Sequence, residues 1–151
     1  MNPTSVSGTI VQEITIKGPA ERIFEALTNP GQRVKWWGAK GRFQTTHMES
    51  DLRLGGKWLM RGTGYGKQVA VMGEYCQIER PRLLVFTWLP SWQEDATESM
   101  VRFDLEEKNG VTTVRLTHSG LAGESSYASH KGWPQILTWL RAYVEQQAQD
   151  G

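Results

Sequence analysis

Alternation of apolar and polar residues predicts that most of this chain is β-strand. In TIVQEITI, residues 9–16, isoleucines occupy one face and polar residues the other, which is typical of a half-buried strand. Asn109-Gly110 is the clearest hairpin signal between two such runs. From residue 42 onward the runs are RFQTTH, KWLMRG, QVAVMGEYCQI, LLVFTWL, SMVRFDLEE and TTVRLTHS. Each lies one turn from the next, so we expect an antiparallel meander that joins the first strand in a curved sheet of about seven.

Two short helices are expected after the first strand. GPAERIFEAL has a proline suited to a first helical turn and an apolar stripe, and Asn29-Pro30 ends it. VKWWGAK then places Trp36 and Trp37 at the end of a second short helix or in a loop. Because adjacent side chains diverge, we expect that the two rings do not point into the same core.

A long C-terminal helix is predicted over residues 132–147. Pro134 is tolerated if it lies in the first turn. The apolar stripe of one helix face is Trp133, Ile136, Leu137, Leu140 and Val144. No later strand is available, so this stripe must be buried on the concave face of the sheet, which we call the palm. The expected fold class is α+β, with the curved antiparallel sheet wrapped around the last helix.

Size and composition favour one globular domain over residues 1–151. Basic residues number 17 and acidic residues 16, and their scattered arrangement argues against a nucleic-acid partner. No apolar run approaches the roughly 20 residues needed to span a bilayer. Cys76 is the single cysteine, and the first residues lack the pattern of a signal peptide. We therefore expect a cytoplasmic protein.

Local motifs indicate neither a metal nor a cofactor. His47, His118, His130 and Cys76 show none of the usual metal-ligand spacings. No nucleophile signature is present, and GTGYG at residues 62–66 lacks the ending of a phosphate-binding loop. We assign no catalytic residue from sequence and expect no bound cofactor.

The same alternation identifies side chains that should face the palm, and many of them are aromatic. Seven tryptophans in 151 residues exceed what packing requires, although a plain core is the alternative. The candidate ligand-binding residues are Trp36, Trp37, Trp58, Met60, Tyr75, Phe86, Trp88, Phe103, His118, Trp133 and Leu137. An aromatic wall with a few polar groups is the usual composition of a small-molecule site.

Three polar or small positions bear on this site. His118 shares a face with Val114 and Leu116, so it should point inward, either satisfied by a neighbouring hydroxyl or backbone group or serving as an anchor or acid/base for a ligand. Arg102 is a further candidate for orienting a ligand. Gly73, in mid-strand, suggests room for a ligand or for Trp133.

Six motifs in order give the chain a resemblance to a known family. They are PAERIFEALTNP, WWG, DLRLGGKW, MGEYCQIERPRLLVFTW, LTHSGL and GWPQIL, and they span nearly the whole chain. The chain resembles the bacterial homologues of the activator of the Hsp-90 ATPase, within the START/SRPBCC superfamily that includes birch-pollen-allergen relatives and polyketide cyclases. This resemblance implies the helix-grip fold.

Three functions remain open at this point. The first is binding of a small hydrophobic or aromatic molecule between the sheet and the last helix. The second is a cyclase- or hydrolase-type enzyme that uses the same cavity, with His118 or Tyr75 as acid/base. The third is a chaperone-related interaction module with an exposed apolar patch. Trp92 in WLPSW is a candidate for such a patch or for a homodimer contact.

Overall fold

Seven antiparallel strands form one sheet, and the last six of them form the meander that the sequence predicts, while the first strand pairs with the seventh. The structure is a computed structural model, and it describes residues 8–38, 43–64, 66–91, 97–121 and 124–150. The strands are β1 (Gly8–Lys17), β2 (Phe43–Ser50), β3 (Lys57–Gly64), β4 (Lys67–Glu79), β5 (Leu83–Pro90), β6 (Ser99–Lys108) and β7 (Val111–Leu121). The helices are α1 (Ala20–Thr28), α2 (Pro30–Trp36) and α3 (Glu124–Asp150).

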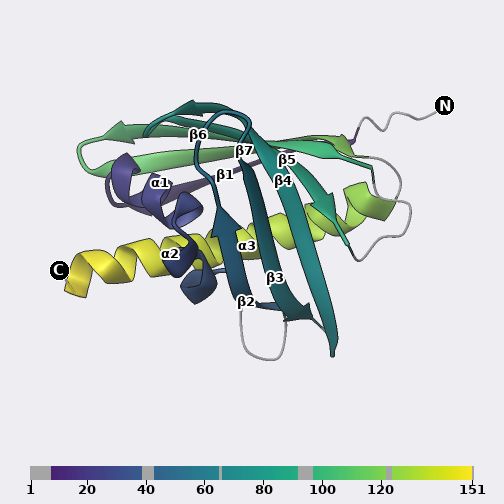
Figure 1. The fold of residues 1–151 in the computed structure, drawn as a ribbon. Coiled ribbons are helices and arrows are strands. Elements are labelled where there is room, and N and C mark those ends of the chain that lie inside the picture. The colour runs from purple at the N-terminus through teal and green to yellow at the C-terminus, as the bar shows by residue number, and fades with distance from the viewer. Residues whose placement is uncertain (1–7, 39–42, 65, 92–96, 122–123, 151) are drawn as a thin grey trace.

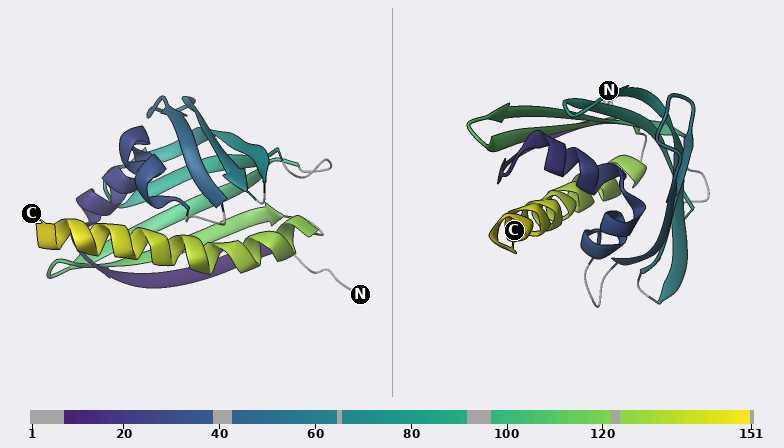
Figure 2. Two further views of the ribbon diagram at one scale, coloured as in Figure 1. Left: turned by 90° about the horizontal axis from the view of Figure 1, so that it is seen from below. Right: turned by 60° about the vertical axis from the view of Figure 1, so that its left-hand side comes forward.

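The sheet curves around the helices (Figure 1). The right-hand view of Figure 2 shows that the sheet is strongly curved and that α1, α2 and α3 all lie on its concave side. In this sheet β1 forms one edge, beside β7, and β2 forms the other edge at the end of the meander. The fold is therefore the expected α+β helix grip, with both short helices and the long helix on the concave side.

The hairpin between β6 and β7 confirms the strongest local turn signal. Asn109 has a φ of 54° and Gly110 a φ of 78°, the two positive values that a type I′ turn requires. Lys108 therefore lies directly opposite Val111. The register continues from this turn into the centre of the sheet.

Helix α3 is longer than its apolar stripe predicts. It begins at Glu124, so Pro134 lies in the helix interior and not in the first turn. The prediction of a start at residue 132 was wrong because the preceding turns carry no apolar stripe from which to read them. Four of the five residues of the stripe are buried as expected, with Trp133, Leu137 and Leu140 each at most 2 % exposed, while Ile136 is only partly buried.

One hydrophobic cluster joins the sheet to all three helices. Ile23 and Phe24 of α1 are completely buried, as is Leu140 of α3. Burial on this scale is the main stabilising term of a fold of this size. No helix in the described ranges is long and apolar enough to cross a membrane.

Candidate functional site

All eleven residues predicted to line the palm are buried and belong to one core cluster, apart from His118, which is polar and packs within it. The most exposed of them, Trp88, is only 6 % exposed. They come from α2 and the residue after it, from β3, β4, β5, β6 and β7, and from α3. The alternation along each strand therefore placed these side chains on the correct face.

The tryptophans of the palm contact one another directly. The ring of Trp88 lies 6.0 Å from that of Trp37, 6.0 Å from that of Trp58 and 5.5 Å from that of Trp133, between centroids. Phe86 meets Trp58 edge-on at 5.2 Å. These separations are typical of favourable aromatic pairs. In this structure the rings fill the space between the sheet and α3.

Trp36 and Trp37 both enter this core, which corrects the expectation that they diverge. Each is 4 % exposed, and their ring centroids lie 5.2 Å apart. The reason is that α2 ends at Trp36, while Trp37 has an extended backbone with φ −85° and ψ 92°. The direction of the chain changes between the two residues, so both side chains face the palm. Trp36 Nε1 donates to the carbonyl of Ala26 at 2.8 Å.

His118 is fully buried, and both of its ring nitrogens are bonded to protein groups. Trp133 Nε1 donates to His118 Nδ1 at 2.9 Å, so Nε2 carries the proton and donates to Ser99 Oγ at 2.8 Å. Ser99 Oγ in turn donates to the Trp88 carbonyl at 3.3 Å. Burial lowers the pKa of His118 to about 4, which keeps the ring neutral. This is the satisfied histidine of the two alternatives drawn from the sequence.

Arg33 of α2 is a buried cation that the sequence analysis missed. It is 3 % exposed, and Nη1 donates to the Leu27 carbonyl at 2.6 Å, at the C-terminal end of α1. Its guanidinium carbon lies 4.2 Å from the ring centroid of Trp37 and 5.6 Å from that of Trp58. The signal in the sequence was the spacing of Arg33, three residues before Trp36 and so on the same face of a short helix.

Two nitrogens of Arg33 have no hydrogen-bond partner in the described part of the chain. They are Nε and Nη2, and the indole Nε1 of Trp58 is also unpaired and buried. Buried donors are nearly always hydrogen-bonded in proteins, so such exceptions require an explanation. Burial lowers the pKa of Arg33 to about 10, which leaves the guanidinium charged at neutral pH.

Gly73 makes room for Trp58, which corrects the expectation of space for a ligand or Trp133. A Cβ at this position would lie 2.6 Å from Trp58 Nε1 and 1.8 Å from the Thr87 carbonyl oxygen. Trp58 and Gly73 are partners in the pairing of β3 with β4. The glycine therefore allows both the Thr87 carbonyl and the Trp58 indole to approach the backbone of β4 closely.

Tyr75 and Arg102 differ in position although both are polar candidates. Tyr75 is 2 % exposed, its hydroxyl lies 2.6 Å from Ser50 Oγ, and burial raises its pKa. Arg102 lies on the outer face, where it forms a two-point ion pair with Asp104. The expectation that Arg102 orients a molecule in the palm was therefore wrong, because it alternates with the inward-facing Val101 and Phe103.

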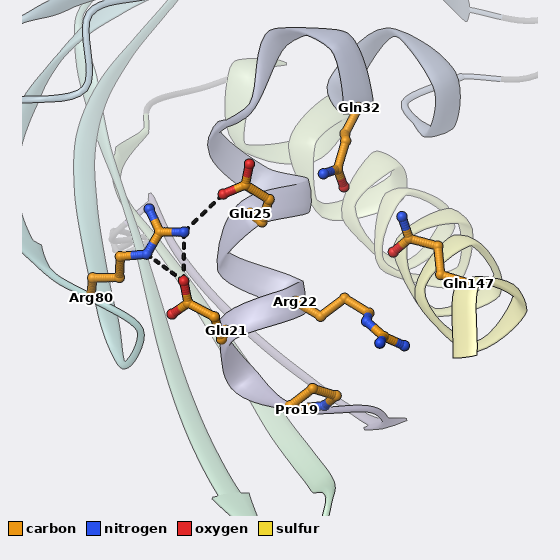
Figure 3. A pocket seen from close by; sticks show the side chains of 7 residues that line it. All are labelled: Pro19, Glu21, Arg22, Glu25, Gln32, Arg80 and Gln147. Atoms are coloured by element: carbon orange, nitrogen blue, oxygen red, sulfur yellow. Dashed lines mark hydrogen bonds and ion pairs between the residues drawn. The ribbon is translucent and has the colours of Figure 1, made fainter. Parts of the chain in front are cut away.

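An open cleft of about 730 Å³ lies outside the palm, between α1, the turn after β4 and the end of α3 (Figure 3). Arg80 crosses this cleft to α1, donating from Nε to Glu21 at 2.6 Å and from Nη2 to Glu25 at 2.8 Å. These three side chains are partly exposed and together carry one net negative charge, and Arg22 brings a further positive charge to the lining of the same cleft. Arg80 is therefore paired with carboxylates, in contrast to Arg33.

The described residues contain no group of three side chains suited to a metal ion. His47 is exposed and contacts Glu49, and Cys76 is an exposed free thiol. Trp92 lies outside the described residues, as does the side chain of His130. The homodimer contact through Trp92 stays a prediction.

Comparison with known families agrees with the fold. The family model of "Activator of Hsp90 ATPase homolog 1-like protein" matches residues 17–145. The chain belongs to this family. The matched range runs from the end of β1 to α3 and so includes Arg33 and every candidate residue of the palm. A search of the curated proteins found no match.

Solved bacterial structures share this family's fold with the chain. Protein CV1439 from Chromobacterium violaceum is 22 % identical with a TM-score of 0.79, over 91 % of this chain and 97 % of that one. A protein from Rhodobacter sphaeroides is 18 % identical with a TM-score of 0.80, over 99 % and 97 %. DynU16, from the dynemicin biosynthetic locus, is 20 % identical with a TM-score of 0.72, over 91 % and 47 %. At these identities the likeness concerns the fold.

Proposed function

We propose that this domain binds one small hydrophobic or aromatic molecule in the palm, between the curved sheet and α3. The observation that carries the proposal is a set of buried donors with no partner among the described residues, Arg33 Nε and Nη2 and Trp58 Nε1, within a cluster of aromatic rings. An unpaired buried donor destabilises a fold by about 1–3 kcal/mol. A ligand that accepts these hydrogen bonds removes that penalty when it binds.

The aromatic lining supplies the apolar part of such a site. Small-molecule pockets combine aromatic walls with a few polar groups that set the orientation of the ligand. The palm has this composition, because five tryptophans and two phenylalanines line it and Arg33 lies against two of these tryptophans, Trp37 and Trp58. DynU16 comes from a biosynthetic locus and has the same fold, which supports a small organic ligand for this chain as well.

Binding requires some rings to move, and the hydrogen bonds indicate which. Trp36 and Trp133 are each held by a hydrogen bond from Nε1, to Ala26 and to His118. Trp37 and Trp88 contact their neighbours through their rings. Neither ring donates a hydrogen bond to the described residues, although the Arg33 guanidinium also contacts Trp37, so either ring moves without leaving a buried donor unpaired. We therefore assign the opening of the palm to Trp37 and Trp88.

The proposal gives His118 a structural role and not one in acid/base chemistry. Its two ring nitrogens are already occupied, and its low pKa keeps it neutral near pH 7. A general base needs a ring nitrogen within reach of the substrate's proton. His118 instead holds Trp133 in place through a hydrogen bond.

For the compartment we propose the cytoplasm, because the chain has one exposed free thiol, Cys76.

Isothermal titration calorimetry with 2-naphthamide, a neutral aromatic probe, tests the proposal. We expect one probe per chain and an affinity that changes when Trp88 is replaced by Phe. Leu54→Ala is the matched control, because Leu54 is 66 % exposed and lies outside the palm. No binding to the wild-type protein, or an affinity sensitive to Leu54→Ala and not to Trp88→Phe, would refute a palm site. Native mass spectrometry of the purified protein would identify any molecule already bound.

A further inference from the structure

The unpaired atoms of Arg33 form one complete edge of the guanidinium. Nη1 is directed to the carbonyl of Leu27, at the C-terminal end of α1, where a cation is favoured by the helix dipole. The N–H of Nε and the N–H of Nη2 beside it point together away from the Nη1 side, and both nitrogens lack a partner among the described residues. Two parallel N–H groups on a planar fork match the two oxygens of a carboxylate.

Another arginine of the same chain uses this edge for that purpose. Arg102 donates from Nε to Asp104 Oδ2 at 2.9 Å and from Nη2 to Asp104 Oδ1 at 3.0 Å. Arg80 likewise directs Nε and Nη2 to the carboxylates of Glu21 and Glu25. In both arginines, therefore, the edge that is empty in Arg33 holds carboxylate oxygens.

No acidic side chain of the described residues supplies the missing carboxylate. Among the described residues, the titratable group that acts electrostatically on Arg33 is Tyr75, and burial raises the pKa of Tyr75 so that its hydroxyl stays neutral. The arginine is nevertheless buried against Trp37 and Trp58. A buried charge is normally paired, so Arg33 is a cation prepared for a partner that the described residues do not provide.

We infer that the ligand of the palm is an organic carboxylic acid with a flat apolar body, and that its carboxylate binds the Nε and Nη2 edge of Arg33. The inference rests on the proposed function, because it names the class of molecule that the same site takes. The body of the acid packs against the rings of Trp37 and Trp58, and Trp58 Nε1 is a third donor in the same cluster. Arg33 acts here as a binding residue.

A matched pair of probes tests the charge. 2-Naphthoate and 2-naphthamide share one ring system, and only the first carries a carboxylate. By calorimetry at neutral pH, we expect the wild-type protein to bind the acid about 10- to 100-fold more tightly than the amide, the range for hydrogen bonds to charged groups. Arg33→Met should abolish this preference, because it weakens binding of the acid more than binding of the amide, which loses only neutral hydrogen-bond acceptance from Arg33.

Two more variants distinguish the two-point hydrogen bonding of the Arg33 guanidinium from its positive charge. Arg33→Lys keeps a cation without the two-point edge, so we expect it to retain only part of the preference. Arg102→Met removes an exposed arginine and should bind both probes like the wild-type protein. Circular dichroism confirms folding of each variant. If Arg33→Met does not fold, the acid-to-amide ratio of the wild-type protein and of Arg33→Lys still decides the question.

The possible outcomes distinguish the two proposals. If the amide binds and the acid binds no more tightly, the inference about the acid is overturned while the proposed function stands. If Arg33→Met folds and keeps the preference, the inference is likewise overturned. If neither probe binds, the proposed function fails, and the inference fails with it.

Discussion

The two ends of the palm differ in how their buried polar atoms are paired. At the His118 end, Trp133, His118 and Ser99 form a directed chain of hydrogen bonds that ends on the Trp88 carbonyl. At the Arg33 end, Arg33 and Trp58 leave three buried nitrogens without partners among the described residues. Both ends contain tryptophan rings, and Trp88 contacts Trp133 at one and Trp58 at the other.

This difference separates stability from binding within one core. A complete hydrogen-bond chain in a low-dielectric interior holds its members in one arrangement. Donors left unpaired lower stability and are retained where a ligand can satisfy them. We therefore expect substitutions at the His118 end to change the free energy of unfolding, and substitutions at the Arg33 end to change ligand binding.

The largest effect is expected for Trp133→Ala. This change empties a large fully buried site and leaves His118 Nδ1 without its donor. Removal of a buried aromatic side chain lowers the free energy of unfolding by about 3–5 kcal/mol. Urea unfolding followed by circular dichroism measures it. Trp139→Ala on the same helix, where the ring is only partly buried, is the control, and equal losses in the two variants would contradict a special role for the His118 end.

A matched pair of Trp→Phe substitutions isolates the hydrogen bonding from the packing. Trp133→Phe and Trp58→Phe each remove an indole N–H and part of a ring, but only the first breaks a hydrogen bond. We expect Trp133→Phe to lower the free energy of unfolding by about 1–3 kcal/mol more than Trp58→Phe, which is the penalty for an unpaired buried acceptor. Equal values from urea unfolding would show that the two ends do not differ.

Acidification should weaken the His118 end. The pKa of His118 is about 4 in the folded protein against 6.5 for an exposed histidine, so the unfolded chain binds the proton first. Stability therefore falls as the pH is lowered between these values, by up to about 1.4 kcal/mol per pH unit. Urea unfolding from pH 7 to 5 should show this slope, and His118→Asn should lack it.

The exposed His47 provides the control for that slope. His47→Asn should keep the pH dependence of the wild-type protein, because its side chain is about half exposed. An unchanged slope in His118→Asn would refute the assignment. A nuclear magnetic resonance titration of the His118 ring gives a second test, since it observes the folded protein directly.

The smallest change in stability is expected for Arg33→Met. The variant loses the hydrogen bond to Leu27 and the contact with Trp37, but it also removes a buried charge that lacks a carboxylate. Replacement of buried charged groups by apolar ones of similar size is often neutral or stabilising. We expect a change within about 1 kcal/mol, similar to that for the exposed Arg102→Met. A loss of about 3 kcal/mol would mark Arg33 as a structural residue and remove the contrast between the two ends.

The palm shows where reasoning from sequence succeeded. Strand alternation placed Trp58, Tyr75, Phe86, Trp88 and Phe103 on the concave face, and the helical stripe placed Trp133 against them. The side chains that face the core recur every two residues in a strand and every 3.6 residues in a helix, so they can be identified from the local sequence. The start of α3 was not predicted because the residues before Gly132 have no apolar stripe.

The pairing of buried polar atoms was decided only by the tertiary structure. The sequence by itself determined the meander from β2 to β7, the hairpin at Asn109-Gly110 and the side of the sheet that the tryptophans of the strands face, because these follow from neighbours along the chain. The pairing of β1 with β7 joins segments far apart in the sequence and was decided by the tertiary structure. Arg33 is buried because the turn between α1 and α2 brings it to the Leu27 carbonyl, and His118 is neutral because Ser99 and Trp133 meet it from other elements. Such contacts depend on distances across the fold, so no local pattern distinguishes a paired donor from an unpaired one.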